Sequence, residues 1–253
     1  MSLEISIATV PMLSDNYCWI LHQDQYAAAI DPGDAEPVLR FLSKNKLKLT
    51  HILCTHHHED HCGGVIELKQ NFNPVVIGPA DLRMPFVTQR VSEGAECNVL
   101  SETATVIATP GHTATHVVYY FPKVRAIFTG DTLFSCGCGR LFEGTPAEML
   151  QSLIKCAFLE DVTAVYCGHE YTEENLLFAT TVDPNNKEIW QRLADVKYLT
   201  RRGLPTVPSN IGLEKSINPF LRTGSPEIRK KLGMEKASAI EVFAELRKRR
   251  DRF

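Results

Sequence analysis

The residues best suited to chemistry form the run Thr-His-His-His-Glu-Asp-His at positions 55–61. Four of them have the spacing H-x-H-x-D-H: His56, His58, Asp60 and His61. Imidazole nitrogens and carboxylate oxygens are the donors that bind zinc and related divalent metals. The run lies inside the chain behind an apolar segment, 52–54, whereas an expression tag lies at a terminus and carries no Asp in register. We therefore interpret the run as a metal-binding motif rather than a solvated histidine loop.

The apolar segment 52–54 is predicted to be a buried strand that ends where the motif begins. If the motif continues extended, side chains alternate, and His56, His58 and Asp60 point to one side of the chain. The residues between them then point away, and His61 closes the turn. Two imidazoles and a carboxylate are thus expected together at the carboxyl end of a strand.

Three later strands are predicted to end in a similar way, with a glycine followed by a residue that can bind metal. The strands at 105–109, 126–129 and 164–167 lead to His112, Asp131 and His169. Ligands gathered at the same ends of several strands are how open α/β sheets build their sites. The sequence therefore offers five imidazoles and two carboxylates to one candidate site.

Seven ligands are too many for one tetrahedral ion, which takes three or four. Two ions that share the Asp131 carboxylate would use all seven, and each would keep room for a shared water. The expected partition gives the first ion His56, His58 and His112, and the second ion Asp60, His61 and His169. Imidazole with carboxylate suits zinc, iron and manganese, and we expect two zinc ions first.

The composition is that of an ordinary soluble globular protein, with 253 residues, 44% hydrophobic, 23% charged and a formal net charge of -3. This charge, without a broad basic stripe, argues against nucleic acid as a partner. No apolar run approaches the roughly 18 residues of a membrane span, and the first residues lack the features of a signal peptide. We expect a cytoplasmic monomer that acts on a small molecule.

Eight cysteines could indicate a disulfide framework, but several lie in apolar strand-like segments, where free Cys packs as a small hydrophobe. With no export signal, we interpret them as reduced thiols. Cys136 and Cys138 form the one close pair. Because a partner pair and the usual two-residue spacer are lacking, we do not interpret them as a metal or redox site.

Strands and helices alternate over the first two thirds of the chain, which predicts an α/β sandwich. The other strands are expected at 5–10, 17–21, 25–30, 75–77, 97–100 and 117–121, with helices at 35–45, 65–70 and 147–158. After Tyr171 the periodicity is helical, with helices expected at 172–181, 187–201, 226–232 and 237–250. The segment 203–219, which holds three prolines, is predicted to be a loop without regular structure. We expect a domain at 1–170 and a second, all-helical domain at 171–253.

The motif T-H-x-H-x-D-H, with Gly-His-Thr, Gly-Asp-Thr and Gly-His at later strand ends, resembles the metallo-β-lactamase superfamily over about residues 5–170. The resemblance implies an αββα sandwich that binds one or two metals at one edge. Asp31, in Asp-Pro-Gly, matches a superfamily motif whose Asp usually supports the site from behind the ligands.

A narrower resemblance, to the glyoxalase II family of hydroxyacylglutathione hydrolases, rests on motifs in both proposed domains. These motifs lie at 130–134, 137–145, 166–172, 218–222 and 246–253. The resemblance implies that residues 171–253 complete a glutathione site, with substrate contacts from Arg140, Tyr171, Arg247 and Arg250. Arg forks suit the two carboxylates of glutathione. Two positions depart from the pattern: Phe142 stands where some members have Tyr, and Glu59 fills the variable slot of the histidine motif.

The reaction that this resemblance implies is hydrolysis of S-D-lactoylglutathione to D-lactate and glutathione, the second step of methylglyoxal detoxification. A hydroxide bridging the two metals would attack, with Asp60 and Asp131 as the catalytic carboxylates. The thiol leaving group has a pKa near 8.5, so no protein acid is required.

Four other interpretations stay open. An iron-dependent persulfide dioxygenase of the same superfamily holds one iron with fewer ligands and would leave His61 idle. The basic helical tail disfavours β-lactamase or lactonase chemistry, although such a tail is also what a solvated helix end looks like. Open metal positions argue against a non-catalytic binding module, and net charge argues against a nucleic-acid processor.

Overall fold

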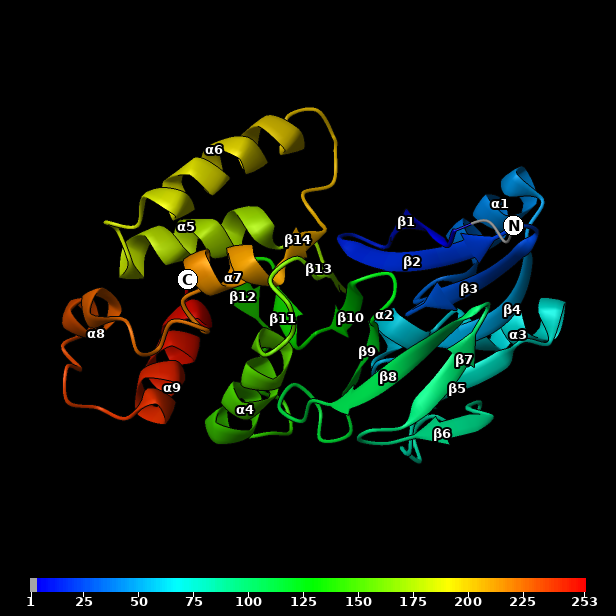
Figure 1. Ribbon diagram of the computed structural model, residues 1–253, viewed down its shortest axis with the longest axis horizontal. Coiled ribbons are helices and arrows are strands. Elements are labelled where there is room, and N and C mark those ends of the chain that lie inside the picture. Colours follow the sequence, from blue (N-terminus) through cyan, green and yellow to red (C-terminus); the bar gives the residue numbers. More distant parts are fainter. Residues whose placement is uncertain (1–3) are drawn as a thin grey trace. The chain divides into compact units, whose positions relative to one another are not determined.

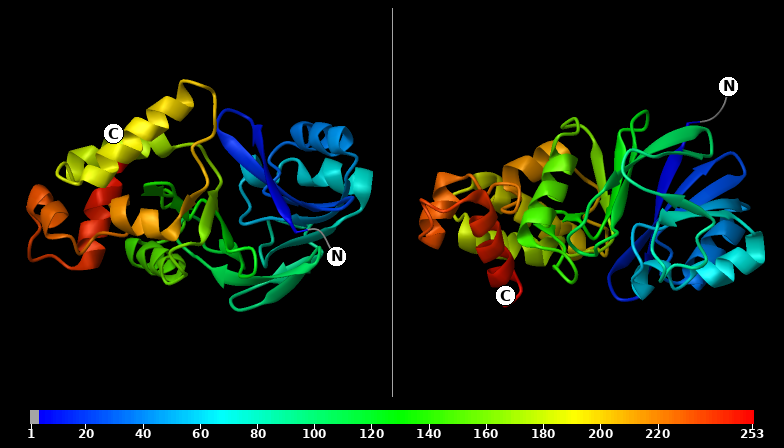
Figure 2. Two further views of the ribbon diagram at one scale, coloured as in Figure 1. Left: turned by 45° about the horizontal axis from the view of Figure 1, so that its top comes forward. Right: turned by 90° about the horizontal axis from the view of Figure 1, so that it is seen from below.

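A computed structural model describes residues 4–253 of the chain (Figures 1 and 2). Its contacts divide the chain into two compact units. The first unit comprises the residues up to Ala108 together with 115–130, and the second comprises 109–114 together with 131–253.

The first unit contains a six-stranded sheet in the order β1-β2-β3-β4-β5-β6. Its strands are β1 (Ser6–Met12), β2 (Asn16–Gln23), β3 (Tyr26–Ile30), β4 (Lys48–Leu53), β5 (Val75–Pro79) and β6 (Gln89–Val91). The first three strands pair antiparallel, and the pairings from β3 to β6 are parallel. Helix α1 joins the parallel strands β3 and β4, because neighbouring parallel strands need a crossover connection.

Helices α1 (Ala35–Asn45) and α3 (Val65–Phe72) pack on this sheet and share one apolar core with it. Asp34 begins α1 by accepting a hydrogen bond from the Glu36 amide, and Val38 and Leu42 lie on its buried face. The core they enter includes Ile20, Ile52 and Val76 from the sheet.

Four more strands of the first unit form an antiparallel set: β7 (Glu96–Val99), β8 (Glu102–Ala108), β9 (Val117–Phe121) and β10 (Ala126–Gly130). The Tyr119 hydroxyl on β9 donates a hydrogen bond of 2.8 Å to the carbonyl of Cys54, which directly follows β4. The side chain is fully buried, so this contact ties the second set of strands to the carboxyl end of β4.

The second unit is mainly helical. Its helices are α4 (Pro146–Ala157), α5 (Thr172–Val182), α6 (Lys187–Thr200), α7 (Ile211–Ile217), α8 (Pro226–Leu232) and α9 (Ala239–Arg250). Helices α4 and α9 both begin with a capping box, in which a Ser or Thr side chain and a Glu three residues later satisfy free backbone amides. Two short strand pairs complete the unit: β11 (Leu133–Phe134) with β12 (Gly137–Cys138), and β13 (Ala164–Cys167) with β14 (Ser209–Asn210).

Two expectations about local structure were wrong. The segment 203–219 is not a loop throughout, because β14 and α7 lie within it. Asn210 caps α7 by accepting from the Leu213 amide, and Ile211, Glu214 and Ile217 form its buried face. The three prolines led to the prediction of a loop. All of them lie outside α7, so they do not interrupt this helix. The extended model of the histidine motif was wrong beyond His58, where helix α2 (Glu59–Cys62) begins.

The other predicted strands and helices are present, with their ends shifted by a few residues. All eight cysteines are buried free thiols. Burial raises the pKa of Cys138 to about 11, so this side chain stays protonated at neutral pH. Among residues 4–253, none of the helices has the length and apolar content that a bilayer crossing requires.

Candidate metal centre

The first group of donors lies in the first unit, in the loop that follows β4. Nε2 of His56 and Nδ1 of His58 are 3.1 Å apart. Two nitrogens bound to one zinc at about 2.0–2.1 Å and a tetrahedral angle lie about 3.3 Å apart, so this spacing fits one edge of a zinc site. Asp60 and His61 follow in α2, where Nε2 of His61 is 3.6 Å from Oδ2 of Asp60.

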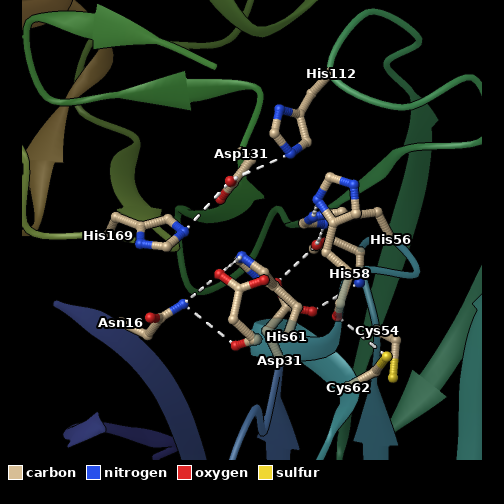
Figure 3. Close-up of polar contacts among 12 residues, drawn as sticks. Asn16, Asp31, Cys54, His56, His58, His61, Cys62, His112, Asp131 and His169 are labelled. Atoms are coloured by element: carbon tan, nitrogen blue, oxygen red, sulfur yellow. Dashed lines mark hydrogen bonds and ion pairs between the residues drawn. The ribbon is translucent and has the colours of Figure 1, made fainter. Parts of the chain in front are cut away.

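Asp31 organises this loop from the end of β3 (Figure 3). Its carboxylate accepts 2.7 Å hydrogen bonds from the amide and from the hydroxyl of Thr55, and it lies 3.1 Å from Nδ1 of His61. The Thr55 hydroxyl is also 3.0 Å from Nδ1 of His56. Because the Nδ1 atoms of both histidines are engaged in this way, Nε2 is the atom that each can present to a metal.

The second group of donors lies in the second unit. Oδ2 of Asp131 is 3.4 Å from Nε2 of His112 and 3.3 Å from Nε2 of His169 (Figure 3). All three side chains are buried. The Nδ1 atom of His112 lies 2.9 Å from the carbonyl oxygen of Arg140, which again directs Nε2 to a metal. One carboxylate oxygen of Asp131 therefore lies near two imidazole nitrogens, at distances typical of two ligands bound to the same metal ion.

Tyr171 contacts one of these donors directly. Its ring stacks on His169 with 4.7 Å between centroids and 5° between planes, and Phe134 meets both rings edge-on. Tyr171, expected at the substrate, therefore packs against the ring of His169, a candidate metal ligand.

Both groups fit divalent metal ions by the chemistry of their donors. Buried imidazoles with carboxylates, oriented by hydrogen bonds on the opposite ring nitrogen, are how proteins hold zinc and its neighbours. Within the first unit, Asp31, His56 and His61 also bring donor atoms within 4.8 Å of one another. The oxygens of Asp31 already accept from Thr55, which favours a supporting role for this residue.

Two arginines near the end of α9, Arg247 and Arg250, and Arg140 after β12 make polar contacts within the second unit. Arg247 is buried, donates a 2.8 Å hydrogen bond to the Cys138 carbonyl and pairs with Asp251 at 2.9 Å. Arg250 donates to the Asn175 side chain at 3.2 Å and pairs at 3.2 Å with Glu174, an exposed carboxylate. Arg140 is largely exposed, and its Nε is 3.8 Å from Asp251.

Asp81 is a structural residue that sequence reasoning missed. It is buried, and its carboxylate accepts hydrogen bonds from the Arg83 guanidinium at 2.7 and 2.9 Å and from the Thr115 hydroxyl at 2.7 Å. Its Oδ2 is 3.8 Å from Nδ1 of His57, which lies between the candidate metal ligands His56 and His58. Nothing in the local sequence marks it, because Thr115 is distant along the chain.

We expect Asp81→Asn to destabilise the metal-free protein in a pH-dependent way. Hydrogen bonds from Arg83 and Thr115 lower the pKa of Asp81, so its contribution to stability is present above the unfolded-state pKa of about 3.8 and is lost as pH falls below it. At neutral pH the variant should lose about 2 kcal/mol of unfolding free energy, the scale of hydrogen bonds to a charged group. Urea unfolding at several pH values measures this.

The difference in unfolding free energy between Asp81→Asn and the wild type should become smaller as pH falls below about 4. Asp24→Asn is the control, because Asp24 is exposed in a turn of the same unit and should change stability little. A loss that stayed constant down to the lowest pH would contradict a role for the ionised carboxylate.

The fold and the donor groups define a member of the metallo-beta-lactamase superfamily. The family model described as "Metallo-beta-lactamase superfamily" matches residues 13–169, and the model described as "Hydroxyacylglutathione hydrolase C-terminus" matches residues 170–253. The hydroxyacylglutathione hydrolase of Photobacterium profundum is 44% identical over 254 residues, covering 98% of this chain and 100% of the relative. That of Rhizobium meliloti is 46% identical and covers 95% of each. The chain therefore belongs to the hydroxyacylglutathione hydrolase family of this superfamily, as the sequence motifs predicted.

Solved structures support the same fold. The structure of the BLEG-1 B3 metallo-beta-lactamase has a TM-score of 0.66 at 24% identity and covers 85% of this chain and 99% of that chain. ETHE1 from Myxococcus xanthus has a TM-score of 0.65 at 23% identity and covers 98% of both chains. These likenesses confirm the predicted metallo-beta-lactamase fold, which is followed here by a helical carboxyl-terminal part.

Proposed function

We propose that this chain hydrolyses the thioester S-D-lactoylglutathione to D-lactate and glutathione. The family supports the reaction, because relatives named hydroxyacylglutathione hydrolase align over nearly the whole chain. The observation that carries the proposal is the Asp131 carboxylate, one oxygen of which lies within 3.4 Å of two imidazoles. A carboxylate so placed suits a ligand that bridges two metal ions.

The proposed centre would hold two divalent ions, with zinc as the first expectation and iron or manganese compatible. His56, His58 and His112 would hold the first ion and Asp60, His61 and His169 the second, with Asp131 as a ligand available to both. When bound, the ions would lower the pKa of a shared water toward 7 and stabilise negative charge on the thioester carbonyl oxygen.

Asp60 and Asp131 are the proposed catalytic residues. Their carboxylates can accept a hydrogen bond from the attacking water and so direct its lone pair to the thioester carbon. Breaking the carbon–sulfur bond releases a thiolate, whose conjugate acid has a pKa near 8.5, so departure needs no acid from the protein. Asp31 supports the site by orienting His61.

We assign residues 1–170 to a metal-binding catalytic domain and 171–253 to a domain that binds the glutathione part of the substrate. The ranges of the two family matches support this division. Arg140, Tyr171, Arg247 and Arg250 are the proposed contacts. Arg247 and Arg250 would hold the glycine carboxylate of glutathione, and Arg140 would contact glutathione separately. Arg247 also donates a hydrogen bond to the Cys138 carbonyl of the β11–β12 hairpin. The enzyme is proposed to act as a cytoplasmic monomer on this small thioester, without nucleic acid or membrane as a partner.

The test of the function is cleavage of S-D-lactoylglutathione by the purified protein, with metal content determined on the same sample and oxygen uptake followed on glutathione persulfide. Rapid hydrolysis with about two metal ions per chain is the expected result. No hydrolysis, a single iron and oxygen uptake would overturn it in favour of persulfide dioxygenation.

Arg250→Ala is expected to raise KM for the thioester about tenfold or more and to leave kcat within a few-fold. The lost contact is a hydrogen bond between charged groups, worth about 1.5–3 kcal/mol, and it lies away from the reacting atoms. Steady-state kinetics measure both constants. Arg249→Ala is the matched control, because Arg249 pairs with Glu245 on the same helix. An unchanged KM for Arg250→Ala would mean that glutathione binds at another surface of the protein.

A further inference from the structure

Asn16 makes two hydrogen bonds to a single residue of the metal-binding motif. It is the first residue of β2 and is 5% exposed. Its side-chain amide donates to the Oδ2 atom of Asp60 at 2.9 Å and to the backbone carbonyl of Asp60 at 3.2 Å. The amide therefore constrains both the side chain and the backbone of a residue 44 positions away.

Asp60 needs such a constraint more than the histidines around it. Its side chain is 41% exposed, whereas that of His61 is 1% exposed. It belongs to α2, which has four residues and so contributes little rigidity of its own. Packing alone therefore does not fix the orientation of the Asp60 carboxylate.

The chemistry of the donor matters as well. A carboxylate oxygen has two lone pairs, and the hydrogen bond from Asn16 uses one of those on Oδ2. The same oxygen lies 3.6 Å from Nε2 of His61, so its second lone pair can serve a metal that His61 also binds. A neutral amide fixes the oxygen without adding a positive charge, whereas Lys or Arg in its place would repel a bound cation.

We propose that Asn16 is a positioning residue that holds Oδ2 of Asp60 beside His61 and thereby sets the affinity of the second metal ion. This inference rests on the proposed function, in which Asp60 and His61 bind that ion. Asn16 itself touches neither metal nor substrate, so it acts through Asp60.

The test compares Asn16→Leu and Asn16→Asp with the wild type. Leu keeps the approximate volume but cannot donate, and Asp adds a carboxylate within hydrogen-bond distance of Asp60. Zinc is titrated into the metal-free proteins in competition with a chromophoric chelator, and kcat and KM are measured on S-D-lactoylglutathione. Circular dichroism of the metal-free proteins checks folding. Asn71→Leu is the control, because Asn71 is an exposed Asn of the same unit.

In Asn16→Leu we expect the second zinc to bind about 10–100-fold more weakly, the range for losing a group that orients a ligand, with the first zinc unchanged. In Asn16→Asp the repulsion between two adjacent carboxylates should turn Asp60 away from His61, so kcat should fall in both variants while KM stays near its wild-type value. If both zinc affinities equalled those of the wild type, or if both fell equally, the role proposed for Asn16 would be wrong while the proposed function would stand. A wild type that binds only one ion would overturn the proposed function and this inference together.

Discussion

His58→Ala is expected to lower kcat/KM for the thioester by at least about a thousandfold and to remove one metal ion per chain. His58 supplies one of three imidazoles proposed for the first ion, and its Nδ1 lies 3.1 Å from Nε2 of His56. Losing that ion removes one of the two cations that would lower the pKa of the shared water from about 15.7 toward 7, so little hydroxide would form at neutral pH. Steady-state kinetics and metal analysis of the same sample measure both effects.

His57→Ala is the matched control for this prediction. It removes the neighbouring imidazole from the same loop, but His57 lies beside Asp81 and outside the proposed ligand set. It should retain two metal ions and lose activity by no more than about tenfold, as residues that only support a site do. If His58→Ala kept substantial activity at full folding, or if His57→Ala were the more damaging change, the assignment of ligands by H-x-H spacing would be wrong.

The candidate metal ligands could be predicted because each one is marked by a pattern in the residues directly around it. Each of His112, Asp131 and His169 follows a glycine after an apolar strand, and the strands themselves are evident from their composition. The structure confirms those strands. That two ions share the Asp131 carboxylate was inferred by counting ligands and stays a prediction; in the structure Oδ2 of Asp131 lies within 3.4 Å of Nε2 of both His112 and His169.

The residues that hold the donors could not be predicted in the same way. Asn16 reaches Asp60 across 44 positions, and Asp81 reaches Thr115 across 34. Such contacts depend on which strands lie side by side, which local patterns do not specify. Helix α2 was missed for a related reason: four residues are too few to show a period.

The buried polar residues of α7 and its carboxyl end belong to the same class. Glu214 is fully buried and accepts a 2.7 Å hydrogen bond from the Cys136 amide, and Asn218 donates to the carbonyl of Gly137 at 3.0 Å. These contacts fix the β11–β12 hairpin that Arg247 also contacts. The family motif at 218–222, Asn-Pro-Phe-Leu-Arg, thus has a structural reason in the contacts of Asn218, which only the folded chain reveals.

Gly33→Ala is expected to be among the most damaging single substitutions in the first unit. A Cβ atom at Gly33 would overlap the backbone carbonyl of Asp60, and backbone cannot move aside as a flexible side chain can. Overpacking of this kind costs typically about 1–3 kcal/mol and occasionally more, and we expect at least about 3 kcal/mol here. Urea unfolding of the metal-free protein measures the loss apart from any effect of bound metal.

The same overlap should act on the site, because it pushes the backbone of Asp60 and that of residue 33 apart. We therefore expect the variant, where still folded, to bind its second metal ion more weakly. Gly224→Ala is the control: a Cβ there meets no atom within 4 Å, so stability should stay level or rise by up to about 1 kcal/mol. If Gly33→Ala proved as stable as Gly224→Ala, the close approach of Gly33 to Asp60 would not exist in solution, and the glycine of Asp-Pro-Gly would need another explanation.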